Sequence, residues 1–187
     1  MFDLLTPKSV LSQISRLTTV IIESGLSEEE NFPSMKEYSG GIKEVGISNA
    51  DHSIFLKSIP YSEMYKEARK NRAYNLKMID GALVTFQYRF LNDSLVAHRL
   101  TFFPDPELVS FQNEPLLYLE DEIYADILSG GVFPTPFRFD FDKNEAVCRP
   151  IEHPISHFTV GQYKNCRIPV SSALTPYQFI NFVTRNF

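Results

Sequence analysis

The sequence has no tryptophan, only two cysteines and only four histidines in 187 residues. The cysteines, Cys148 and Cys166, are too few for a disulfide framework, which favours free thiols in a reducing cytoplasm. No apolar run approaches the roughly 20 residues that cross a bilayer. No basic patch followed by an apolar stretch indicates a signal peptide. We therefore expect a cytoplasmic protein that does not engage a membrane.

Several common functional motifs are also missing. The sequence has no GxGxxG or Walker A loop, so nothing indicates a bound nucleotide cofactor. It has no CxxC or HExxH pattern for zinc and no GxSxG turn for a nucleophilic serine. We therefore expect no cofactor and no metal, and any catalysis has to come from the side chains themselves.

The composition is that of a globular protein whose charge is unevenly distributed. Hydrophobic residues make up 43% and charged residues 22%, and 18 basic against 23 acidic side chains leave a net charge of −5. Residues 51–104 carry eight basic and five acidic side chains, whereas residues 105–126 carry seven acidic and no basic ones. RNA is a candidate partner only at a local basic surface. The 105–126 segment is either a solvated helix face or a docking site for a basic protein partner.

Capping residues and apolar spacing predict four helices. Thr6-Pro7 and Thr175-Pro176 each place a capping threonine before a proline that suits the first helical position. Apolar residues then recur at helical spacing, and Gly25 is a typical residue to follow a helix end. The predicted helices cover residues 6–25, 60–72, 117–128 and 175–187, and the third of them is acidic and amphipathic.

Alternating patterns predict an antiparallel sheet. Residues 82–90 and 95–103 alternate on either side of the turn residues Asn92-Asp93, which predicts a hairpin. The sequence FRFDFD at 137–142 directs three phenylalanines to one face and its charged residues to the other. Shorter strands are predicted at 54–56, 157–163 and 166–170, and residues 27–46 are predicted to form a loop or weak hairpin.

These elements together define the fold class as α+β. We expect a mostly antiparallel sheet from the C-terminal two-thirds of the chain, with helices packed on it. The sequence shows no linker or repeat, so we expect a single domain over residues 1–187. Its N-terminal part, 1–72, is expected to be helical, and the β-rich part, 73–187, to carry the candidate site.

Five histidine and arginine side chains are the candidates for a site: His98, His153, His157, Arg138 and Arg167. Metal-independent RNA cleavage needs a group that takes the 2′-OH proton, a group that protonates the leaving oxygen, and cations over the transition state. Histidine titrates near neutral pH, and arginine matches phosphate oxygens with a planar fork. In this hypothesis His153 and His157 exchange protons, while Arg138 and Arg167 hold the phosphate.

Two alternatives explain the same residues. A metal site could use the two C-terminal histidines with Asp140 and Asp142, although Pro154 argues against the helix that the histidine spacing would suit. The residues could instead form a buried polar network that locks the sheet. His98 shares a face with apolar residues such as Leu100, so it would then be a core histidine.

Three segments carry a resemblance to a known family: HRLTFFPDPEL (98–108), FRFDFD (137–142) and HPISHFTVGQYKNCRIPVSSALTPYQFINFVTRNF (153–187). Over about residues 74–187 the chain resembles a bacterial domain-of-unknown-function family, DUF2290. The resemblance implies a lone cytoplasmic protein of mobile or defence-type gene neighbourhoods, and no activity comes with it. The order of an Arg-Asp strand and a later His-Pro…His segment is more distantly similar to small toxin RNases of toxin–antitoxin pairs.

The sequence therefore predicts an accessory or effector protein of a bacterial defence or toxin–antitoxin type system, with metal-independent ribonuclease activity as the enzymatic hypothesis. The alternative is a non-enzymatic interaction module of a larger defence complex, whose acidic 105–126 segment docks a basic partner. Convergence of the candidate side chains in an open cleft would favour the enzyme. Burial of the same side chains with every polar atom paired would favour the module.

Overall fold

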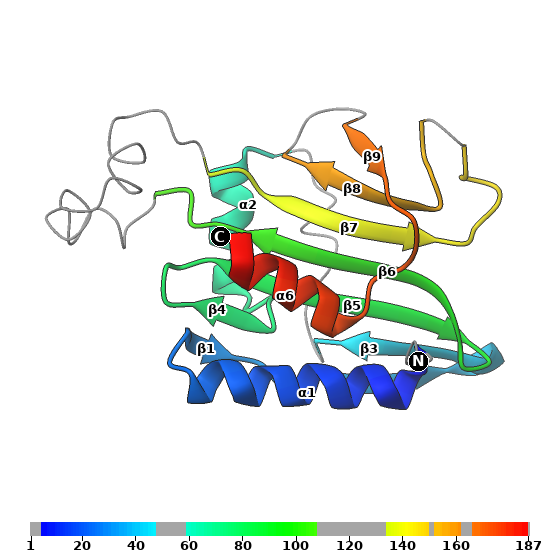
Figure 1. Ribbon diagram of the computed structural model, residues 1–187, viewed down its shortest axis with the longest axis horizontal. Coiled ribbons are helices and arrows are strands. Elements are labelled where there is room, and N and C mark those ends of the chain that lie inside the picture. Colours follow the sequence, from blue (N-terminus) through cyan, green and yellow to red (C-terminus); the bar gives the residue numbers. More distant parts are fainter. Residues whose placement is uncertain (1–4, 48–58, 108–133, 150–151, 162–165, 187) are drawn as a thin grey trace, which may run out of the picture.

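The predicted hairpin of residues 82–103 forms the centre of a nine-stranded antiparallel sheet (Figure 1). The fold class is α+β, as the sequence predicted, with helices on both faces of the sheet. The computed structural model describes residues 5–47, 59–107, 134–149, 152–161 and 166–186.

The elements follow one another along the chain as Figure 1 labels them. The helices are α1 (Pro7–Glu23), α2 (Tyr61–Lys70) and α6 (Pro176–Asn186), and a short 3-10 turn, η1, covers Ser39–Gly41. The strands are β1 (Ser27–Glu30), β2 (Ser34–Tyr38), β3 (Ile42–Gly46), β4 (Leu76–Met78), β5 (Leu83–Leu91), β6 (Ser94–Phe103), β7 (Phe137–Asp142), β8 (Ser156–Val160) and β9 (Arg167–Pro169).

The sheet has the order β1-β4-β5-β6-β7-β8-β9, and β3 pairs with β5 as well as with β2. One side of β5 is therefore bordered by β4 and β3 end to end, and its other side by β6. At the β5–β6 turn Asn92 and Asp93 have φ angles of 48° and 63°, a conformation that Asn and Asp tolerate better than most residues. The predicted turn chemistry thus fixes the central hairpin.

The predicted capping residues begin α1 and α6, which lie on the same face of the sheet (Figure 1). The Thr6 hydroxyl accepts a hydrogen bond from the Ser9 backbone N–H at 3.2 Å, and the Ser9 hydroxyl accepts one from the Thr6 N–H at 3.0 Å. Thr175 and Gln178 make the same reciprocal pair before α6. Gly25, with a φ of 67°, follows the end of α1.

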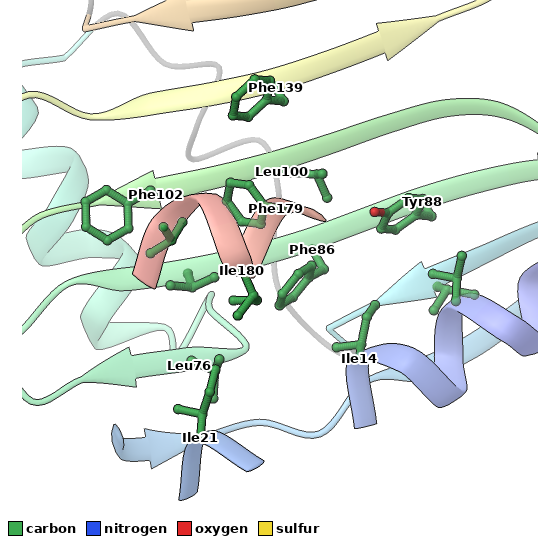
Figure 2. Close-up of a cluster of buried hydrophobic side chains, with 14 of the residues drawn as sticks. Ile14, Ile21, Leu76, Phe86, Tyr88, Leu100, Phe102, Phe139, Phe179 and Ile180 are labelled. Carbon is green, nitrogen blue, oxygen red and sulfur yellow. The ribbon is translucent and has the colours of Figure 1, made fainter. Parts of the chain in front are cut away.

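The main core lies between this face of the sheet and the two helices (Figure 2). Phe86 of β5 and Phe179 of α6 are completely buried and meet edge to face, with ring centroids 5.7 Å apart. Ile14 and Ile21 extend the core along α1. Burying each such side chain contributes about 1.5–3 kcal/mol, so this face accounts for most of the hydrophobic stabilisation.

In the part of the chain that the structure describes, a helix covers the opposite face at one end only. Met64, Tyr65 and Ala68 of α2 pack against Leu83 of β5 and Phe103 of β6. Beyond this small cluster the outward positions of β5 to β9 are mostly polar. The placement of α2 therefore leaves the rest of this face for the candidate site.

The N-terminal part differs from the sequence prediction. Residues 27–46 form three strands, of which β2 and β3 make the hairpin that was one of the two predicted alternatives. Residues 1–72 therefore contribute strands as well as helices. The strand predicted at 54–56, the helix predicted at 117–128 and most of the acidic 105–126 segment lie outside the described residues.

Two further sequence predictions concern thiols and membranes. Cys148 and Cys166 are both free and half-buried. Within the residues that the structure describes, no helix has the length and apolar character needed to cross a membrane.

Candidate functional site

Two rows of polar side chains cross the face of the sheet opposite α1 and α6. Antiparallel pairing keeps directly opposed residues on the same face, so the strand register defines each row. The first row, from β5 to β9, is Thr85, Thr101, Arg138, Thr159 and Arg167. The second row, from β5 to β8, is Gln87, Arg99, Asp140 and His157.

A cavity of about 680 Å³ opens on this face and is lined by residues from β2 to β9. The lining includes the whole second row and, from the first row, Arg138 and Arg167. All five predicted site residues belong to its lining, and four of them contribute side chains to this face: Arg138, His153, His157 and Arg167. The pairing of β7, β8 and β9 brings Arg138, His157 and Arg167 together, and the ring of His153, which precedes β8, packs against His157. Their convergence in one cavity is the arrangement expected of a functional site.

Asp140 is the electrostatic centre of this cavity. Its Oδ1 accepts a hydrogen bond from Arg99 Nε at 2.8 Å, and its Oδ2 accepts one from Arg138 Nε at 2.6 Å. Burial alone would raise the pKa of the Asp140 carboxyl, but the charges and hydrogen bonds of the two arginines hold it below its usual value. Asp140 is therefore an anion at neutral pH and orients both guanidinium groups.

His157 lies beside Asp140 and is only 2% exposed. Its Nδ1 is 2.8 Å from the Pro154 carbonyl oxygen, so Nδ1 carries the proton and donates it to that oxygen. Its Nε2 lies 3.6 Å from Asp140 Oδ2. Burial lowers the pKa of His157, and the charges of His153 and Arg167 lower it further, against the opposing effects of the Pro154 carbonyl and Asp140. The His157 ring is thus held in one orientation.

His153 is the more accessible of the two histidines. It is half-buried, and its ring centroid lies 4.9 Å from that of His157, with the ring planes at 67°. Its backbone exchanges two hydrogen bonds of 2.9 Å with Arg149. Among the described residues nothing hydrogen-bonds to the His153 ring, so its nitrogens remain available to a ligand.

The two predicted phosphate-binding arginines keep free donors. Arg167 donates from Nη1 to the Glu152 carbonyl oxygen at 3.1 Å, while its buried Nε has no partner in the part of the chain described. Arg138 uses Nε for Asp140, and a guanidinium has five N–H donors. Both side chains can therefore bind oxygen atoms of a ligand in the cavity.

His98 is the one predicted site residue whose side chain lies on the other face. Its ring sits between Tyr88 and Phe141, with centroid distances of 5.4 and 5.6 Å, and Nε2 accepts a hydrogen bond from the Leu174 N–H at 3.0 Å. Burial lowers the pKa of His98 to about 4. His98 is therefore a neutral core histidine whose ring lies on the face opposite the cavity, although the residue belongs to the cavity lining.

The cavity is positively charged although the chain as a whole has a net charge of −5. Burial and proximity make these local charges more important for a ligand than the net charge. The cationic lining residues are Lys36, Arg89, Arg99, Arg138 and Arg167, and the anionic ones are Glu44, Asp140 and Asp142. The excess of cations favours a ligand that carries negative charge.

Asp140 and Asp142 do not gather with the histidines into a metal site. Over the described ranges, no three His, Cys, Asp or Glu side chains lie close enough together to hold a metal ion. The Asp140 carboxylate is already hydrogen-bonded by Arg99 and Arg138. The side chains of this site are therefore better suited to binding an anion than a cation.

Sequence reasoning did not select several residues of this cavity. Arg99 could have been predicted from the sequence, because the alternation that directs His98 to the apolar face directs Arg99 to the polar face. Arg89 has the same signal within β5. Lys36 and Tyr38 have none, since they line the cavity only through the pairing of β2 with β3, which the sequence left open.

The fold and the site define an α+β protein whose central sheet is apolar on one face and carries a cationic cavity on the other. Residues 26–187 match the family model described as Uncharacterized conserved protein (DUF2290), and the chain belongs to this family. The match includes every strand of the sheet and begins after α1. No curated protein and no solved structure matches the chain.

Proposed function

We propose that the chain is a metal-independent ribonuclease whose active site is the cationic cavity. The observation that carries this proposal is the lining of the cavity, which combines His153 and His157 with five cationic side chains against three carboxylates. A phosphodiester is the anion that this combination suits, because arginines bind phosphate oxygens and histidine transfers protons near neutral pH. A ribose 2′-OH supplies the nucleophile, so no metal-bound water is required.

In the proposed reaction the 2′-oxygen attacks phosphorus, and a 2′,3′-cyclic phosphate forms as the bond to the 5′-oxygen breaks. His153 takes the proton of the 2′-OH, since it is the accessible histidine. The 5′-oxygen receives a proton from solvent as His153 releases its own, so the proton balance is closed. Arg138 and Arg167 bind the non-bridging oxygens and stabilise the charge that develops on them.

The buried residues of the site have a positioning role in this proposal. Asp140 holds Arg99 and Arg138 in fixed orientations through hydrogen bonds of 2.8 and 2.6 Å. His157 packs against His153 at a centroid distance of 4.9 Å and is anchored at Nδ1. The proton exchange predicted for His153 and His157 thus falls mainly on His153, because His157 is only 2% exposed.

The test is cleavage of a synthetic RNA by the purified full chain in the presence of a chelator. We expect His153→Gln to lower the cleavage rate by a factor of about 100 or more, the usual contribution of a general acid or base. Arg167→Gln should lower it as well. Arg16→Gln, on the exposed face of α1, is the matched control. No cleavage by the intact chain, or equal cleavage by His153→Gln at an unchanged melting temperature, would contradict the proposal.

We further infer an effector role in a bacterial defence or toxin–antitoxin type system, which the resemblance of the His and Arg segments to toxin RNases supports. Induced expression in a bacterial host should arrest growth and fragment RNA, and His153→Gln at matched abundance should do neither. If the chain cleaves RNA in vitro but does not arrest growth, the effector role is wrong. If neither effect is seen, the non-enzymatic interaction module becomes the better explanation.

A further inference from the structure

Four arginines form a diagonal across the polar face of the sheet. They are Arg89 on β5, Arg99 on β6, Arg138 on β7 and Arg167 on β9. Arg89 opposes Ala97, so Arg99 lies two residues further along β6 on the same face. Arg138 opposes Thr101, which is two residues beyond Arg99 in the same direction. Arg167 lies in the same row as Arg138. We call these four residues the arginine diagonal.

The spacing of the arginine diagonal is regular over its first two steps. One step combines a strand separation of about 4.8 Å with a two-residue rise of about 6.7 Å, which places successive Cα atoms about 8 Å apart. A stretched sugar–phosphate backbone has a repeat of similar size. A line of cations at this spacing can contact successive phosphates of one strand.

The arginine diagonal has more positive charge than its partners neutralise. Arg99 and Arg138 share the single carboxylate of Asp140. Arg89 is paired with Glu44 at 2.7 Å, but its side chain is 60% exposed. Surface pairs of this kind are weak, so a polyanion can compete with Glu44 for Arg89.

Tyr38 lies at the end of the cavity that is farthest from Arg167. It is 49% exposed although it lines the cavity, and Glu44, the partner of Arg89, interacts with its hydroxyl and raises its pKa. The ring therefore stands beside the first arginine of the diagonal. An exposed aromatic ring next to a cationic track is the arrangement by which proteins stack the bases of single strands.

The cavity extends across much of the sheet. Its lining spans β2, β3, β5, β6, β7, β8 and β9, which is six strand spacings, or about 29 Å. A ligand that reaches from Tyr38 to Arg167 therefore has to be an extended chain.

We propose that the ligand of this cavity is single-stranded RNA, with its phosphates along the arginine diagonal and one base stacked on Tyr38. This inference rests on the proposed function, because it places the scissile phosphate at the end formed by Arg138 and Arg167, beside His153. The Tyr38 end then binds nucleotides remote from the cleaved bond. Substrate preference is set by strandedness and length.

The test is the binding of a labelled 2′-O-methyl RNA octanucleotide, which cannot be cleaved, measured by fluorescence anisotropy. We expect Tyr38→Ala to raise Kd at least about fivefold, as loss of one stacked base does, and Tyr38→Phe to retain binding. Arg89→Gln should raise Kd and reduce the salt dependence by about one counterion. Tyr177→Ala, which removes a 62% exposed ring on α6, is the matched control and should bind normally.

The same assay separates this inference from the cleavage reaction. The chain could cleave RNA while Tyr38→Ala and Arg89→Gln bind the octanucleotide as the intact chain does. The proposed binding mode would then be wrong, and the proposed ribonuclease activity would stand. If the variants bind as expected but natural RNA is not cleaved, the binding mode stands and the ribonuclease activity is wrong. Three outcomes would overturn the proposed binding of single-stranded RNA along the arginine diagonal. The intact chain could bind a duplex as tightly as the octanucleotide, or it could fail to bind the octanucleotide. It could also bind heparin equally tightly, with an affinity that Tyr38→Ala does not change.

Discussion

The two faces of the central sheet are made from alternate residues of the same strands, and they differ in how many of their buried polar groups have a hydrogen-bond partner. On the face under α1 and α6, Phe86, Tyr88, Leu100 and Phe139 pack together, and Tyr88 donates its hydroxyl to the Leu174 carbonyl oxygen. On the opposite face the described part of the chain leaves the buried hydroxyls of Thr85, Thr101 and Thr159 and Nε of Arg167 without partners, against Nδ1 of His98 on the face under the helices.

Unpaired buried donors cost stability, so the polar face is not arranged for stability alone. Its charges are instead concentrated where β6, β7 and β8 meet, around Asp140. The comparison indicates that the apolar face holds the fold together while the polar face is available for a ligand. Substitutions on the two faces should therefore have different effects on stability and on ligand binding.

Truncation of a core side chain should have the largest effect on stability. Phe86→Ala removes a fully buried ring that packs against Phe179, and should lower the free energy of unfolding by about 3–5 kcal/mol. The neighbouring Thr85→Val replaces a hydroxyl with no partner in the described structure, and should be neutral or stabilising. Urea unfolding followed by circular dichroism measures both. If both variants lost a similar amount of unfolding free energy, the two faces would not differ in their contribution to stability.

Asp140→Asn should have the largest effect on the polar face. It leaves Arg99 and Arg138 without their anion, and because both side chains are 29% exposed we expect a loss of about 2 kcal/mol, below the range for fully buried pairs. The depressed pKa of Asp140 means that this stabilisation is present above the ordinary aspartate pKa and is lost as pH falls through the folded value. The variant should therefore lose less stability on acidification than the intact chain.

His98 should make the stability of the apolar face sensitive to mild acid. Its pKa is about 4 in the folded chain against an ordinary value of 6.5, so the unfolded chain binds a proton first as pH falls. Stability should decline between these two values, by about 2 kcal/mol at pH 5 from His98 alone. His98→Gln should show a shallower decline in urea unfolding from pH 7 to 5. If His98→Gln declines as steeply with pH as the intact chain, the His98 ring is protonated in the folded chain as readily as in the unfolded chain.

Glu44→Gln should have the smallest effect. Its ion pair with Arg89 is largely exposed, and such pairs contribute about 0–1 kcal/mol. The melting temperature should hardly change, whereas the affinity for single-stranded RNA should rise because Arg89 is released. A large loss of stability would show that this end of the polar face is structural.

Much of the fold was predictable because its signals are local. The Thr-Pro caps, the Asn92-Asp93 turn and the alternation of FRFDFD each depend on a few consecutive residues, and the structure confirms all three. The β2–β3 hairpin was left open, because its polar strands lie at the edge of the sheet and lack a continuous apolar side. The family match over residues 26–187 confirms the family that was expected from the later segments.

The candidate site was predictable in part for a related reason. Arg138, His153, His157 and Arg167 were selected by residue type, and the structure places them around one cavity. The interaction of Asp140 with Arg99 could not be derived, because it joins two residues that are 41 positions apart in the sequence.

The sequence by itself determined which face each strand residue occupies, since side chains alternate with a period of two along any pleated strand. It therefore already separated His98 from Arg99 and the phenylalanines of β7 from Arg138 and Asp140. Only the tertiary structure decided which residues of neighbouring strands oppose one another, because register results from long-range pairing and packing on one buried face. That register aligned Arg99, Asp140 and His157 in one row and so created the cationic cavity.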